Sequence, residues 1–103
     1  MHVHLILIKL KPGVRRTDPK VVAWEALFAE LPMKVGGIVR WEYGWNTTDR
    51  PIAYDFGVNA GFATRADLDA YGPHPSHQEV VARLRGIADW VICDYEHGER
   101  VGD

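Results

Sequence analysis

Three side chains that can move protons lie within a short stretch in the second half of the chain: Tyr71, His74 and His77. An imidazole titrates near physiological pH, so it can accept a proton from one atom and return it to another. A phenol hydroxyl can donate a hydrogen bond that polarises a carbonyl group. These residue types could therefore carry acid–base chemistry, in which an imidazole accepts a proton and the Tyr71 hydroxyl polarises a carbonyl group.

His77 is the best placed of these groups, because it shares its spacing with apolar residues of an expected helix. That helix begins at Pro75, and His77, Val81 and Leu84 follow at i, i+4 and i+7, which puts His77 on the inward face. Partial burial and the positive N-terminal end of a helix both disfavour the imidazolium, so we expect a neutral ring near pH 7. The alternative is a purely structural His77 that packs and hydrogen-bonds at the helix break.

The other polar candidates have structural alternatives as well. His4 shares a strand face with Ile6 and Ile8, where a histidine more often satisfies its hydrogen bonds in the core than binds a ligand. His74 stands between two prolines and is expected to cap the turn. Tyr71 ends an expected helix on its core side, where its hydroxyl could polarise a ligand or only find a partner in a packed corner.

Metal and cofactor chemistry have no recognisable motif in this sequence. The five histidines form no His-Glu-x-x-His arrangement, and a single cysteine leaves no Cys pair, so no metal site is expected. A glycine-rich phosphate loop, a nucleophile elbow and a dinucleotide fingerprint are also missing, so no cofactor is expected. Cys93 has no base beside it in the sequence and is expected to be inert in the core.

The composition is that of one ordinary globular domain. The chain has 103 residues, of which 47% are hydrophobic and 25% charged, with a formal net charge of −2. A slightly acidic chain is a poor partner for nucleic acid or an anionic membrane. No apolar run approaches the length of a membrane-spanning helix, and residues 1–10 lack a cationic signal-peptide start. Together with the single cysteine, these features favour a cytoplasmic location.

The residues that could do chemistry are positioned by an alternation of strands and helices. Apolar and β-branched runs bounded by turn residues predict strands, which cover His2–Leu10, Ile38–Trp45, Ala53–Phe62 and Asp89–His97. N-cap and proline signals predict helices from Pro19 to Leu31, from Thr64 to about Tyr71, and from Pro75 to Gly86. The order β-α-β-β-α-α-β is an α+β, ferredoxin-like arrangement, in which helices cover one face of a four-stranded antiparallel sheet. The domain is expected to span residues 1–98, with a flexible tail at 99–103.

The opposite face of this sheet has no predicted cover. The first strand is apolar on that side at Val3, Leu5 and Leu7, and a bare apolar sheet face is rare on a soluble monomer. Gly57 and Gly61 of the third strand leave room for the close approach of another backbone. We therefore expect a homodimer in which two sheets pack face to face.

Several motifs together resemble one known family, the stress-responsive A/B barrel (Dabb) domains, which form dimeric α/β barrels. The resemblance covers nearly the whole chain and rests on His4-Leu5-Ile6-Leu7-Ile8-Lys9-Leu10-Lys11-Pro12-Gly13, Tyr43-Gly44-Trp45-Asn46, Tyr54-Asp55, Asp67-Leu68-Asp69-Ala70-Tyr71, His74-Pro75-Ser76-His77 and Asp94-Tyr95-Glu96. The chain is also similar to plant polyketide cyclases of the olivetolic acid cyclase type, which close a linear polyketide by an aldol step with no metal and no organic cofactor. This resemblance implies that His77 is the base, that Tyr71 supports it and that His4 lines the pocket.

The resemblance further implies a small, largely apolar carbonyl ligand. Its expected contacts are His4, Phe56 and His74, and Phe56 stands where those cyclases have a further pocket histidine. Two other functions stay open. One is a non-enzymatic stress-response or binding module, and the other is a cofactor-free monooxygenase of the same barrel architecture.

Overall fold

The computed structural model describes residues 1–98, whose strands form one antiparallel sheet. The four strands are β1 (His2–Leu10), β2 (Ile38–Trp45), β3 (Phe56–Phe62) and β4 (Ala88–Glu96), and they lie in the order β2-β3-β1-β4. The apolar β1 and the glycine-containing β3 are therefore the central strands. The predicted α+β, ferredoxin-like sheet is confirmed, and the tail expected at 99–103 lies outside the described residues.

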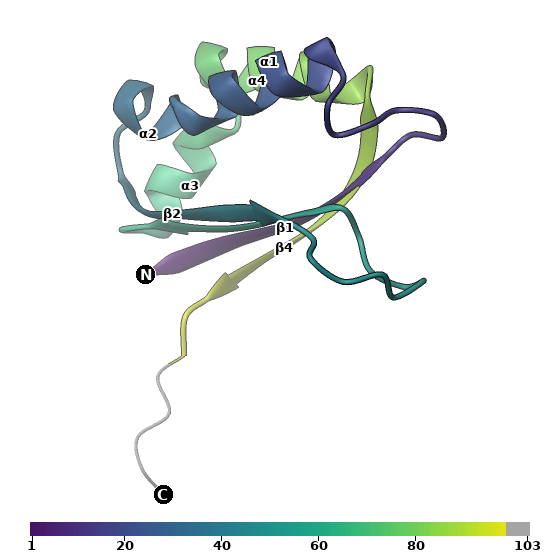
Figure 1. Cartoon of the computed structure of the whole chain (residues 1–103). Helices are drawn as coiled ribbons and strands as arrows, with labels where there is room; N and C mark the ends of the chain where they lie inside the picture. The colour runs from purple at the N-terminus through teal and green to yellow at the C-terminus, as the bar shows by residue number, and fades with distance from the viewer. Residues whose placement is uncertain (99–103) are drawn as a thin grey trace, which may run out of the picture.

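The described helices all lie on one face of the sheet (Figure 1). They are α1 (Pro19–Ala29), α2 (Leu31–Lys34), α3 (Arg65–Tyr71) and α4 (Pro75–Arg85). The short α2 was not predicted: Pro32 does not end helical structure but lies in the first turn of α2, where its missing N–H is not needed. Within residues 1–98, no helix is long and apolar enough to cross a membrane.

Helix α1 follows the predicted apolar stripe. Val21, Trp24 and Phe28 are buried at spacings of three and four, which is the period of one helix face. Asp18 occupies the N-cap position, but its carboxylate accepts the N–H of Arg15 at 2.9 Å instead of capping the helix. The indole of Trp24 donates to the carbonyl of Val80 at 3.2 Å, and this bond ties α1 to α4.

The core lies between the sheet and the helices. From the sheet it contains Ile6, Ile8, Phe56, Val58, Ala60 and Phe62, and from the helices Val21, Trp24, Phe28, Leu31, Leu68, Tyr71, Val80 and Leu84. Strand residues at every second position face the helices, as the alternation predicted. The same layer contains Tyr71 and His77, so the candidate site is built into the core side of the sheet.

Strand β3 begins three residues later than predicted, at Phe56 rather than Ala53. The cause is Asp55, whose carboxylate accepts the N–H of Leu10 at 2.7 Å. The backbone N–H of Asp55 still donates to the carbonyl of Ile8 at 2.9 Å. A side chain thus replaces part of the strand ladder here, and the preceding residues form a loop.

Strand β2 contains a bulge between Ile38 and Arg40 that the regular alternation did not predict. The extra residue, Val39, is 60% exposed. The extra residue interrupts the alternation, so Ile38 and Arg40 lie on opposite faces of the sheet although they are two positions apart. Ile38 packs against the core, and Arg40 pairs with Glu42 at 3.5 Å on the other face.

The sheet face opposite the helices exposes large apolar side chains. Leu7, Val91 and Tyr95 are 41%, 51% and 39% exposed. Cys93 also lies on this face, since it is paired with Leu5 across the sheet, and it is exposed. The prediction that Cys93 is a core residue is therefore wrong for the single chain, because β4 is an edge strand and none of residues 1–98 covers Cys93 on this side.

One part of this bare face is covered by the chain itself. A Cβ atom added at Gly61 would collide with the side chain of Met1, so Met1 occupies the space above that glycine. Val3, which pairs with Gly61, is fully buried. The absence of a side chain at Gly61 therefore makes room for the chain's own N-terminus.

Candidate functional site

The break between α3 and α4 positions the two residues singled out first. Thr64 caps α3, since its hydroxyl oxygen accepts the N–H of Asp67 at 3.1 Å. At the start of α4, Nδ1 of His74 accepts the N–H of Ser76 at 3.1 Å, which is the capping role expected for His74. The two helices meet so that the rings of Tyr71 and His77 lie 4.0 Å apart between centroids.

His77 is held by a backbone carbonyl. Its Nδ1 lies 2.9 Å from the carbonyl oxygen of Gly72, and because a carbonyl only accepts, Nδ1 carries the proton. The lone pair is then on Nε2. Burial lowers the pKa of His77, the bond to Gly72 opposes this shift, and the nearby His4 and His74 add to the lowering. The ring is therefore neutral at physiological pH and can act as a base.

Tyr71 is buried beside this base, with only 2% of its surface exposed. Burial raises the pKa of its hydroxyl well above the ordinary value, so the group stays protonated. Its ring also contacts Phe62, with centroids 5.0 Å apart, and the edge of His4 at 6.1 Å. Tyr71 can therefore donate a hydrogen bond but cannot supply a phenolate.

His4 enters the site from β1 and is 9% exposed. Its Nδ1 hydrogen-bonds to the carboxylate of Asp94, which is directly opposite it on β4. Asp94 was not among the site residues predicted from the sequence. The signal that could have found it is the pairing of β1 with β4, because one carboxylate on the inner face of β4 is then placed against a histidine of β1.

Two adjoining hollows open beside these side chains. The outer one has a volume of about 430 Å³, is lined by polar groups that include His4, Tyr71, His77 and Asp94, and has Arg65 at its wall. The inner one, of about 170 Å³, continues between the sheet and the helices and is lined mainly by apolar side chains. Both hollows share His4, Tyr71, His77 and Ile92, so a polar region leads into an apolar end.

The structure does not bring Phe56 or His74 to these hollows. Phe56 is 1% exposed and packs against the aromatic rings of Trp24, Phe28 and Trp45 in the core. The ring of His74 is engaged as the cap of α4. Three of the five predicted site residues therefore meet in one place, and the other two lie outside it.

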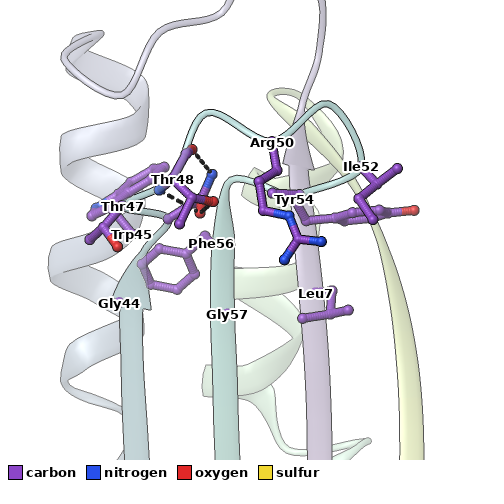
Figure 2. A pocket seen from close by; sticks show the side chains of 12 residues that line it. Leu7, Gly44, Trp45, Thr47, Thr48, Arg50, Ile52, Tyr54, Phe56 and Gly57 are labelled. Atoms are coloured by element: carbon purple, nitrogen blue, oxygen red, sulfur yellow. Dashed lines mark hydrogen bonds between the residues drawn. The ribbon is translucent and has the colours of Figure 1, made fainter.

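Phe56 instead borders a separate hollow of about 600 Å³ at the loop between β2 and β3. Figure 2 shows this hollow, with Arg50 extending from the loop toward Leu7. It shares no lining residue with the hollows around His77 and contains no histidine. Among residues 1–98, no group of three or more His, Cys, Asp or Glu side chains is arranged to hold a metal ion.

The sequence matches the model of one protein family and is similar to one bacterial protein. The family described as Stress responsive A/B Barrel Domain matches residues 3–97. An uncharacterized protein of Streptomyces coelicolor is 45% identical over 93 residues, which is 90% of this chain and 96% of that protein.

Solved structures share the fold at low sequence identity. A dimeric protein of unknown function with a ferredoxin-like fold from Bacteroides fragilis has a TM-score of 0.76 at 24% identity, covering 93% of this chain and 95% of that one. A hydroxynitrile lyase from Passiflora edulis has a TM-score of 0.83 at 15% identity, covering 98% of this chain and 96% of that one. At these identities the likeness establishes the fold alone.

Proposed function

The chain belongs to the stress-responsive A/B barrel domain family, and from this premise we propose that it acts on a small, largely apolar carbonyl compound by acid–base catalysis. The observation that carries the proposal is the pair of Tyr71 and His77 at the junction of a polar and an apolar hollow. The polar region suits a carbonyl group, and the apolar end suits a hydrocarbon tail.

In an aldol closure, His77 acts as the base and Tyr71 acts as the hydrogen-bond donor. Nε2 of His77 takes a proton from the carbon next to the ligand's carbonyl, while the Tyr71 hydroxyl donates to the carbonyl oxygen as negative charge develops there. The resulting enolate carbon attacks a second carbonyl of the same ligand, forming a carbon–carbon bond and an alkoxide. His77 returns its proton to that alkoxide, so the protein ends the cycle unchanged.

The pair of His4 and Asp94 forms the opposite wall. Because Nδ1 of His4 is bound to the carboxylate, the orientation of the ring is fixed and Nε2 is left for the ligand. We assign His4 the role of an acceptor, because the Nε2 lone pair can take a hydrogen bond from the ligand's enol or from the hydroxyl group that the closure forms. A positioned base of the His77 kind contributes roughly 100- to 10,000-fold in rate, which sets the size of the effect to look for.

We also propose that the functional unit is a homodimer joined through the bare sheet face. The exposed Leu7, Val91 and Tyr95 support this choice of face, since they would leave water on pairing. The described dimer of the Bacteroides fragilis protein, which has the same fold, supports the dimeric state. The hollows around His77 are lined by residues of α3 and α4 and by strand residues that face the helices, so they stay open when the sheets pair through the opposite face.

Two probe reactions test the catalytic proposal. A linear 3,5,7-trioxo thioester with a short alkyl tail reports aldol closure, because attack of its C2 on the C7 carbonyl forms a six-membered ring. Mandelonitrile reports base-assisted release of a carbonyl compound, a test suggested by the hydroxynitrile lyase with this fold. We expect His77→Ala to lose at least about 100-fold in kcat/KM on the active probe while remaining dimeric. The matched control is His97→Ala, which removes an exposed histidine at the end of β4.

Two outcomes contradict the proposal. Turnover by His77→Ala at the wild-type rate would remove His77 from the mechanism. Tight binding of the probes without turnover by the wild-type protein would favour the alternative function, a non-enzymatic binding module of the same fold.

A further inference from the structure

The two histidines of the outer hollow are held in the same hydrogen-bonding state, although they come from different elements. Nδ1 of His77 lies 2.9 Å from the carbonyl oxygen of Gly72, and Nδ1 of His4 is bound to the carboxylate of Asp94. A carbonyl and a carboxylate both accept hydrogen bonds, so each Nδ1 carries the proton of its ring. In each neutral ring Nε2 then has the lone pair, and both rings line the same hollow.

Tyr71 supplies the opposite kind of group beside these two rings. The centroid of its ring lies 4.0 Å from that of His77 and 6.1 Å from that of His4. Because burial raises the pKa of the Tyr71 hydroxyl, this group keeps its proton and acts as a donor. The protein therefore offers two acceptors and one donor in one place, and the matching ligand has two donors and one acceptor.

The charged groups around the outer hollow do not favour an anion. Within residues 1–98, Arg65 is the only lysine or arginine that lines it, and its Nε lies 3.2 Å from the carboxylate of Asp69. Asp69 and Asp94 are both in the lining, so one cation stands against two carboxylates. A ligand carboxylate would meet this negative excess, whereas an uncharged hydroxyl group would not.

We propose that the ligand of this site is an uncharged compound that carries two hydroxyl groups, as enols or phenols, close to an acceptor oxygen. The hydroxyls donate to Nε2 of His4 and Nε2 of His77, and the acceptor oxygen takes the hydrogen bond of Tyr71. An apolar tail extends into the inner hollow. This ligand class rests on the proposed function, because it concerns the same site, but its binding is measured without turnover.

Buried acceptors of this kind distinguish a hydroxyl group from its methyl ether. His4 is 9% exposed and Tyr71 is 2% exposed, so water does not readily replace a hydrogen bond that the ligand fails to make. A methyl ether has no proton to donate and leaves the imidazole lone pair without a partner. We expect a loss of roughly tenfold in affinity for each such hydrogen bond.

The first measurement is the protonation of the imidazole nitrogens by ¹⁵N NMR above neutral pH. We expect a protonated Nδ1 and an unprotonated Nε2 in both His4 and His77, with signals assigned by their loss in His4→Leu and His77→Leu. A protonated Nε2 on either ring would overturn the proposal, because that ring would then donate instead of accepting.

The second measurement compares three ligands that share a propyl tail by isothermal titration calorimetry. The first is 5-propylbenzene-1,2,3-triol, the second is its 1,3-dimethyl ether, and the third is 4-propylbenzoate. The ether keeps all three oxygens but loses both outer donors, and the benzoate carries a negative charge. The triol should bind at least about tenfold more tightly than either of the others.

Variants show whether this preference comes from the lone pairs. The dissociation constant of the ether divided by that of the triol should fall by about threefold or more in His4→Leu and in His77→Leu. A general distortion of the hollow weakens both ligands and leaves this ratio unchanged. The matched control is His97→Ala, which removes an exposed histidine at the end of β4 and should also leave the ratio unchanged.

A further ligand distinguishes enols from phenols. Nona-2,4,6-trione has the same pattern once its outer carbonyls are enolised, and it should displace the triol if the natural ligand is an enol. Binding of the triol without displacement by the trione assigns a phenol.

Several results would overturn the proposal. These are no binding of the triol up to roughly millimolar concentration, equal binding of triol and ether, tighter binding of the benzoate, or an unchanged ratio in both histidine variants. Selective binding of the triol by a protein that turns over neither the thioester nor mandelonitrile would contradict the catalytic function alone and would support this ligand class.

Discussion

The carbonyl of Gly72 determines which ring nitrogen of His77 carries the proton. It accepts a bond from Nδ1 at 2.9 Å and therefore fixes the proton on that nitrogen. Gln78 donates to the same oxygen at 3.0 Å, so the carbonyl is held from two sides at the turn between α3 and α4. A base that is oriented in this way loses little freedom when it meets a ligand.

The lowered pKa of His77 gives a pH profile with a defined sign. We expect log kcat/KM to rise with pH and to level off above a midpoint lower than about 6.5, because only the neutral ring accepts a proton. The measurement is the initial rate across the acid range on whichever probe is turned over. A midpoint above the ordinary value would contradict the burial of this ring, and His77→Ala should lack the midpoint altogether.

The same shift affects stability. The unfolded chain protonates its histidine near the ordinary pKa, whereas the folded chain does so only at lower pH. Between these two values the unfolded state binds more protons, so the free energy of unfolding rises with pH there. This contribution of His77 is lost as pH falls through the window and is fully present above it.

The sequence predicted some site residues and not others, for physical reasons that differ. Tyr71 and His77 are close in sequence, so a helix break was enough to predict their meeting. Asp94 reaches His4 only through strand pairing over 90 positions, which no local pattern reveals. Phe56 was selected from a family position alone, and its size and apolar character place it in the aromatic core instead.

At the scale of elements, the N-cap of α3 is the support on which Tyr71 depends. Thr64 accepts the N–H of Asp67 at 3.1 Å and donates its hydroxyl proton to the same residue's carboxylate at 3.0 Å. Thr64→Ala should therefore lower the free energy of unfolding by about 1 kcal/mol. Urea denaturation measures this, with Thr47→Ala as a control that changes a threonine of the β2–β3 loop. Equal stability of the two variants would show that the Thr64 cap does not stabilise α3.

Helix and strand ends were predictable where they depend on local backbone chemistry. Pro19 and Pro75 mark helix starts because their fixed φ suits the first turn, and Gly86 is the C-cap of α4. The bulge in β2 and the late start of β3 were not predictable, because both depend on contacts with a neighbouring strand. The four-residue α2 was not predicted, because a proline after a helix usually indicates that helical structure ends. Here Pro32 lies in the first turn of a second, short helix, where a proline is tolerated.

At the scale of the whole molecule, the bare sheet face predicts an assembly. Leu7 is 41% exposed near the middle of this face, so a charge there would have to be buried when two sheets pair. Leu7→Glu should therefore give a monomer by light scattering at micromolar concentration. Val22→Glu is the matched control, since Val22 is 57% exposed but lies on α1, on the opposite side of the sheet. A dimer that survives Leu7→Glu would move the interface to another surface.

The position of Cys93 makes its rate of alkylation a measure of how much of the protein is dimeric. It is the chain's only thiol, it is exposed in the single chain, and it shares the bare face with Leu5. If two sheets pair, an alkylating reagent reaches this sulfur chiefly while a protomer is free. The rate of alkylation then falls as the protein is concentrated, and its dependence on concentration reports the dissociation constant without an added label.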